Sequence, residues 1–114
     1  MNPIVERPNV EHYRYAIEWC ALDGEFVATV TEFPSLSWLA MTQIEALRGV
    51  EALVKSVIDD MIESGEGVPE PLSERKFSGR VVVRVDPSVH RKLVTDALRH
   101  GTSLNKYAAE LLSQ

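Results

Sequence analysis

The stretch GRVVVRVDPSVHRKLVTDALRHGTSLNKYAAELLSQ, residues 79–114, decides the fold. Its first residues alternate in character, which predicts a strand over 80–85. One face of this strand is apolar and carries Val81, Val83 and Val85. The other face carries Arg80, Val82 and Arg84. A lone strand leaves its backbone groups unpaired, and units below about 40 residues rarely fold alone. The stretch therefore predicts pairing with the same strand of a second chain.

Two helices are expected after this strand. Asp86 and Pro87 suit an N-cap and a first helical residue, and Gly101 suits the position after that helix. Ser103 is the expected N-cap of the second helix, whose open N-terminus can accept an anion. Pairing of two chains would bury six valines between four helices. The predicted dimer core comprises Val81, Val83, Val85, Leu93, Leu104 and Leu111.

This order of one strand and two helices resembles the ribbon-helix-helix family. A two-stranded ribbon fits the major groove of DNA, and the resemblance implies a homodimer that binds an operator there. By position, the residues that read bases would be Arg80, Val82 and Arg84. The residues that hold phosphates would be Thr102, Ser103, Asn105 and Lys106. The apolar Val82 departs from the usual polar reader and suits a thymine methyl group. In an alternative interpretation, the arginines only keep an edge strand soluble.

Charge divides the chain in two. Residues 1–76 carry six Lys/Arg and 14 Asp/Glu, a net charge of −8, whereas residues 77–114 carry six and three, a net charge of +3. Between these parts, SGEGVPEPLSERKFSG lacks apolar periodicity and has the composition of a linker. We predict an acidic domain over 1–70, a linker over 71–78 and a DNA-binding domain over 79–114.

The composition also excludes several classes of protein. The single Cys20 cannot form an internal disulfide, and the three His are not spaced as ligand pairs, so we expect neither a metal site nor a cofactor. The apolar runs are far shorter than the roughly 20 residues that cross a bilayer, and the N-terminus has no signal pattern. We expect a cytoplasmic protein with no membrane contact.

The acidic domain has the pattern of three strands and a helix. Tyr13, Tyr15, Ile17 and Trp19 alternate along a first strand, and Asp23-Gly24 predicts a hairpin turn to a second strand within residues 25–33. A third short strand is expected over 36–41. Thr42 to Glu45 has the spacing of a capping box, and Ser64-Gly65 would end the helix. Its apolar stripe comprises Ile44, Leu47, Val50, Leu53, Val54, Val57, Ile58, Met61 and Ile62. The fold class is α+β.

No catalytic constellation is visible in this acidic domain. Nuclease chemistry needs several carboxylates in one pocket, but Asp23 falls in a turn while Glu25 and Glu32 flank a strand. We therefore expect no enzymatic activity and interpret the acidic surface as a binding site for a basic protein. The alternative is a still-active hydrolase that uses Asp23, Glu25 or Glu32.

Nearly the whole chain resembles the HicB-type antitoxins. In YRYAIEWCALDGEFVATVTEFPSLSWLAMTQIEAL, the motifs Asp-Gly-x-x-Val-Ala, Glu-Phe-Pro-x-Leu and Thr-x-x-Glu-Ala-Leu occur in that order. Ser35, in place of the usual Gly, and the apolar stretch 38–41 depart from the family pattern. The resemblance implies a partly degraded ribonuclease H-like domain that neutralises a small basic mRNA-cleaving toxin of the HicA type. It also implies that the C-terminal dimer represses the shared operon.

Two questions stay open on the sequence alone. The chain could instead be a solitary ribbon-helix-helix regulator whose N-terminal domain senses a ligand or a protein. Dimers could also assemble into tetramers or larger particles.

Overall fold

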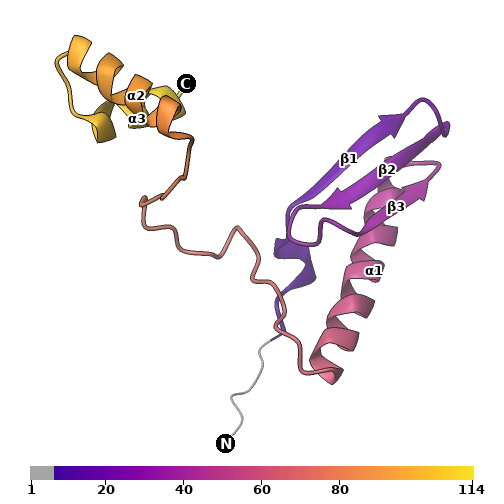
Figure 1. Cartoon of the computed structure of the whole chain (residues 1–114). Helices are drawn as coiled ribbons and strands as arrows, with labels where there is room; N and C mark the ends of the chain where they lie inside the picture. The colour runs from indigo at the N-terminus through magenta and orange to yellow at the C-terminus, as the bar shows by residue number, and fades with distance from the viewer. Residues whose placement is uncertain (1–6) are drawn as a thin grey trace, which may run out of the picture. The chain divides into compact units, whose positions relative to one another are not determined.

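A three-stranded antiparallel sheet forms the frame of the N-terminal unit in the computed structural model, which describes residues 7–114 (Figure 1). The chain divides into two units, the first ending at Phe77 and the second covering Ser78–Gln114. The acidic domain predicted over 1–70 begins in residues 1–6, which lie outside the described part. The sheet has the order β1-β2-β3. The strands are β1 (Tyr15–Cys20), β2 (Glu25–Val30) and β3 (Ser37–Ala40). A short 3-10 helix, η1 (Val10–His12), precedes them.

The predicted hairpin joins β1 and β2. Gly24 has a φ of 65°, a left-handed conformation that costs glycine little, and its N–H donates to the Cys20 carbonyl at 2.9 Å. The register pairs Trp19 with Phe26, whose rings meet edge to face with centroids 5.1 Å apart. The three-stranded α+β prediction is confirmed for this unit.

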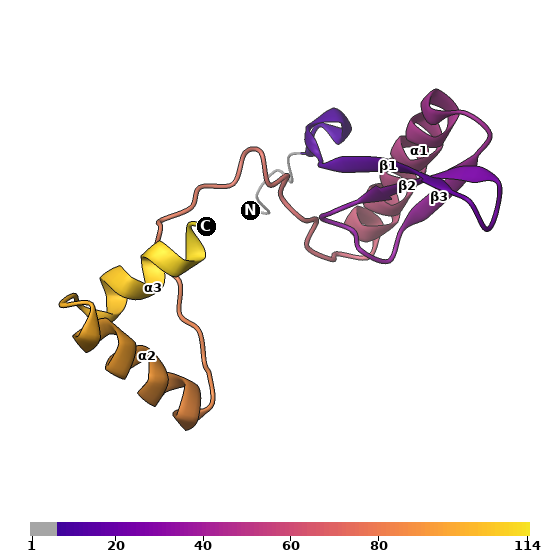
Figure 2. The same cartoon turned by 90° about the horizontal axis from the view of Figure 1, so that it is seen from above.

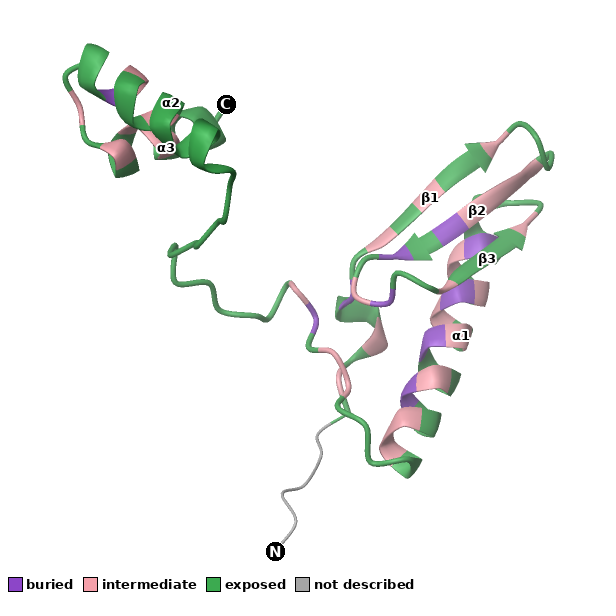
Figure 3. Cartoon of the chain, in the orientation of Figure 1, coloured by how far each residue is buried: buried purple, intermediate pink, exposed green. Residues whose placement is uncertain are grey.

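Helix α1 (Gln43–Glu63) covers one face of the sheet (Figure 2). The Thr42 hydroxyl accepts a hydrogen bond from the Glu45 N–H at 3.1 Å, as the capping spacing predicts. The buried residues of the helix recur every four positions and face the sheet in Figure 3. They are Ala46, Val50, Val54 and Ile58. Across from them, the buried apolar residues are Tyr13, Ala28, Val30 and Phe33.

Several large apolar residues of this unit are exposed, and one of them, Ile44, belongs to the apolar stripe predicted for the helix. Ile44 is 64% exposed and Trp19 is 58% exposed. The reason is the position of α1, which packs mainly on β2 and β3 and only lightly on the edge strand β1. Trp19 is the penultimate residue of that edge strand, and Ile44 lies two residues before the buried Ala46, about 200° around the helix from it.

Residues 69–74, which we call the strap, are bonded to the beginning of the N-terminal unit and to the segment after β2. The Tyr13 hydroxyl donates to the Pro69 carbonyl at 2.6 Å, and the Leu72 N–H donates to the Glu32 carboxylate at 2.8 Å. Pro71 is fully buried. The first part of the expected linker, 71–74, is thus bonded to residues that flank the sheet, and the connection between the units starts after it.

The C-terminal unit contains α2 (Pro87–Arg99) and α3 (Leu104–Leu112). Asp86 and Pro87 take the predicted capping and first helical positions, although the Asp86 side chain makes no capping hydrogen bond. Gly101 has a φ of 64°, and the Thr102 N–H donates to the Ala97 carbonyl at 3.0 Å, which ends α2 in a left-handed turn. No helix formed by residues 7–114 is both long and apolar enough to cross a bilayer.

The strand predicted over 80–85 is not formed. The structure assigns neither helix nor strand to these residues. The physical reason is that no second strand lies beside them within the described chain, so their backbone groups have no ladder to join.

Candidate functional site

An apolar groove of about 620 Å³ lies within the C-terminal unit. All six residues predicted for the dimer core line it: Val81, Val83, Val85, Leu93, Leu104 and Leu111. The three valines are nevertheless well exposed, Val81 at 75%. Only Ala97 is buried in the described part of this unit, so the unit has almost no core of its own. The groove gathers apolar surface from the chain before α2 and from both helices and leaves it open to solvent.

The three predicted base-reading residues lie differently from one another. Val82 is 86% exposed and does not line the groove, and Arg80 is also exposed and outside it. Arg84, by contrast, lies at the groove beside Val83 and Val85. Arg80 and Val82 therefore lie away from the apolar groove, whereas Arg84 lines it.

The N-terminus of α3 holds the four predicted phosphate-binding residues. The Ser103 hydroxyl accepts from the Lys106 N–H at 3.1 Å and caps the helix as predicted. Lys106 is exposed, and Asn105 lies at the rim of the apolar groove. The Thr102 hydroxyl is buried without a hydrogen-bond partner in the described structure, so only a rotated Thr102 side chain could reach a phosphate.

The basic side chains of this unit are available for a ligand. Within the described chain, none of its six Lys/Arg forms a salt bridge with another residue. The His100 ring lies over Tyr107 with centroids 5.1 Å apart, and its Nδ1 makes a 2.7 Å hydrogen bond with the Asp96 carbonyl. An anionic partner would therefore meet unpaired cations, as binding of a phosphate backbone requires.

The carboxylates of the N-terminal unit are dispersed. Asp23 accepts a long hydrogen bond from the Cys20 thiol at 3.5 Å in the hairpin turn, and Glu32 binds backbone N–H groups. Among residues 7–114, no three His, Cys, Asp or Glu side chains gather as metal ligands. Of the residues named for the hydrolase alternative, Asp23 and Glu25 lie at or just before the start of β2 and Glu32 lies beyond its end.

Glu32 and Tyr13 instead hold the strap, a role that the sequence does not reveal. Glu32 accepts from the Arg14 N–H at 3.0 Å and from the Leu72 N–H, and so ties the start of the sheet to the strap. Burial, followed by the charges of Glu32 and Glu74, raises the pKa of Tyr13 to about 12. The His12 ring makes a hydrogen bond with the Glu74 carboxylate, and the Ser73 hydroxyl donates to the His12 carbonyl at 2.8 Å. The bonds that reach the strap join residues 40 or more positions apart, beyond any local motif.

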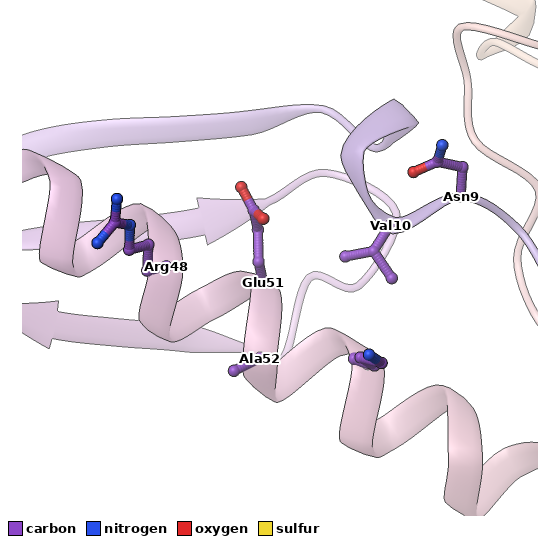
Figure 4. Close-up of a pocket in the computed structure, with 6 residues that line it drawn as sticks. Asn9, Val10, Arg48, Glu51 and Ala52 are labelled. Atoms are coloured by element: carbon purple, nitrogen blue, oxygen red, sulfur yellow. The ribbon is translucent and has the colours of Figure 1, made fainter.

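A shallow hollow of about 410 Å³ separates η1 from α1 (Figure 4). Arg48, Glu51 and Lys55 line it on the helix side. On the other side, the Asn9 side chain accepts from the Glu11 N–H at 2.9 Å, and the Val10 carbonyl accepts from the Tyr15 hydroxyl at 2.7 Å. Burial, and next the charge of Glu51, raises the pKa of Tyr15. The Asn9 side chain and the Val10 carbonyl are therefore already engaged in hydrogen bonds within the fold.

Comparison with known proteins gives one match. Residues 63–112 match the model of the HicB family, a span that runs from the last residue of α1 to the end of α3. No curated protein and no solved structure matches the chain. The match includes the strap, the apolar groove and all seven predicted DNA-contacting residues, and it supports a HicB-type protein related to toxin-antitoxin systems.

Proposed function

We propose that the chain is the antitoxin of a type II toxin-antitoxin pair and that it also represses its own operon. The observation that carries this proposal is the HicB match over residues 63–112. The N-terminal unit, a partial ribonuclease H-like domain without catalytic activity of its own, would bind and neutralise a small basic mRNA-cleaving toxin of the HicA type. The net charge of −8 over residues 1–76 supports this assignment, because opposite charge steers and orients association.

The C-terminal unit would act as a ribbon-helix-helix dimer. Its open groove already gathers the six apolar side chains that a second copy would cover. Pairing residues 80–85 of two chains in antiparallel fashion would satisfy their backbone groups and bury the valines. The same pairing would present Arg80, Val82 and Arg84 twice about a two-fold axis, on a ribbon that fits the major groove.

Co-expression tests the antitoxin assignment. The small basic protein encoded beside this chain should arrest growth when it is expressed alone, and co-expression of the chain should restore growth. The two proteins should also elute as one complex of higher mass. Recovery of a homo-oligomer that binds DNA but no such protein would favour the solitary regulator instead.

Operator binding tests the repressor assignment. The purified chain should bind the DNA upstream of its own gene, and the affinity should fall steeply with salt, with a logarithmic slope near −0.9 per phosphate contact. Arg84→Ala should weaken binding by roughly 1–3 kcal/mol per symmetric contact and leave the toxin complex intact. An association that is independent of salt would contradict phosphate contact.

A further inference from the structure

Exposed apolar side chains gather at the end of the sheet that carries the β1–β2 turn. Leu22 in the turn is 98% exposed, and Met41, just after β3, is 66% exposed. Trp19 at the end of β1 and Ile44 at the start of α1 are also more than half exposed. We call Trp19, Leu22, Met41 and Ile44 the tip patch. Lone apolar residues are common on protein surfaces, but contiguous groups of large ones often mark interaction sites.

The sheet register places these residues at one end. Trp19 pairs with Phe26 and Phe26 pairs with Ala40, so the three strands are level at this row. Leu22 lies in the turn that follows β1, and Met41 directly follows Ala40 at the end of β3. Figure 1 shows the β1–β2 turn, the end of β3 and the beginning of α1 at the same end of the unit.

The charge around the tip patch is mostly negative. Between Arg14 and Arg48 the chain has no Lys or Arg, and this span carries five acidic residues. Four of them lie at or near the tip: Glu18, Asp23, Glu25 and Glu45. Arg48 lies one helical turn after Ile44, so a cationic side chain meets the carboxylates with least competition at the β1–β2 turn, beside Asp23 and Glu25.

Trp19 adds a specific acceptor for such a side chain. Arg and Lys can place their charge over an indole face, and they cover apolar surface with their aliphatic stems. Trp and Arg are also the residues that most often dominate the energetics of protein interfaces. An apolar patch that contains an exposed Trp and has an acidic rim therefore fits the basic surface of a protein.

We propose that the tip patch and its acidic rim form the docking surface for the basic partner protein, with Arg or Lys side chains of the partner over Trp19. This proposal rests on the proposed function and specifies where on the N-terminal unit the partner binds. The strap, the groove of the C-terminal unit and the hollow of Figure 4 would stay outside this interface.

Titration calorimetry with the purified HicA-type protein encoded beside this chain tests the proposal. The full-length chain is compared with two charge variants of equal net change. Glu18→Lys/Glu45→Lys alters the rim, and Glu63→Lys/Glu66→Lys alters the other end of α1, about 27 Å away at 1.5 Å per residue. All four side chains are exposed, so both variants should fold, which thermal unfolding verifies. We expect the rim variant to bind at least about tenfold more weakly, and the distal variant to stay within about threefold of wild type.

An apolar pair of variants completes the experiment. Trp19→Ser should weaken binding at least about tenfold, whereas Phe77→Ser, at a residue of similar exposure outside the patch, should not. Tip variants that bind like wild type would overturn the docking surface and leave the antitoxin assignment standing. Tip variants that lower only the oligomeric mass of the chain would assign the patch to self-association and overturn the proposal as well. Failure of the wild-type chain to bind would overturn both.

Discussion

The indole ring of Trp38 on β3 lies directly against the backbone of Gly49 in the middle of α1. A Cβ atom at position 49 would fall inside the contact distance of three indole atoms, including Nε1. Glycine within a helix costs roughly 0.5–1 kcal/mol relative to alanine, so its presence here needs a packing reason. That reason is the close approach of strand and helix at Trp38.

Gly49→Ala should therefore destabilise the N-terminal unit, although alanine is the better helix former. Overpacking of a tight contact typically costs about 1–3 kcal/mol, which exceeds the gain in helix propensity. Chemical denaturation followed by circular dichroism measures the change. In a Trp38→Leu background the same substitution should become neutral or stabilising, because the clash is gone. Equal effects in both backgrounds would show that the two residues do not interact.

Glu32→Ala should loosen the strap. The Glu32 carboxylate accepts from the Leu72 and Arg14 N–H groups, and removing a charged acceptor from such bonds costs about 1–3 kcal/mol. Hydrogen exchange should then become faster at the Leu72 amide, and the free energy of unfolding should fall. Glu18→Ala, at an exposed position of β1, is the control and should change neither quantity. Unchanged protection at Leu72 would mean that Glu32 does not hold the strap.

Tyr13 should make the N-terminal unit sensitive to alkali. Its pKa is raised to about 12 from an ordinary value of 10, because burial and the charges of Glu32 and Glu74 disfavour the phenolate. The folded form thus binds this proton more tightly than the unfolded form does. The resulting stability is complete below about pH 10 and is lost as the pH rises towards 12. Thermal unfolding between pH 8 and pH 11.5 should show a smaller alkaline loss for Tyr13→Phe than for wild type.

The features that the sequence predicts correctly are those decided within a few residues. The turn at Gly24, the cap at Thr42 and the left-handed end of α2 at Gly101 each depend on bonds between close neighbours in the chain. Such bonds leave a signature of residue types at fixed spacing. The order of three strands and a helix follows from these signatures together with apolar periodicity.

The strap and the exposed tip have no such signature. Tyr13 meets Pro69 across 56 residues and Glu32 meets Leu72 across 40, and no spacing rule links these positions. Ile44 fits the apolar spacing of α1 but is 64% exposed, because the buried positions begin at Ala46 on another side of the helix. Gly49, a glycine inside a helix, is a local sign of the close contact with Trp38. No strand of the described chain lies beside residues 80–85, so a single copy has no ladder in which the predicted strand could form.

In the proposed ribbon, two neighbouring valines separate dimer formation from DNA binding. Val83 lines the apolar groove, whereas Val82 lies outside it and is 86% exposed. Val83→Asp places an unpaired charge in the shared core and should abolish the dimer, as sedimentation equilibrium would measure. Val82→Asp makes the same chemical change on the other face. It should leave the dimer intact and weaken operator binding, because a carboxylate then faces the DNA. A dimeric, soluble Val83→Asp protein would contradict the burial of this face, and a Val82→Asp protein with unchanged operator affinity would remove Val82 from the DNA interface.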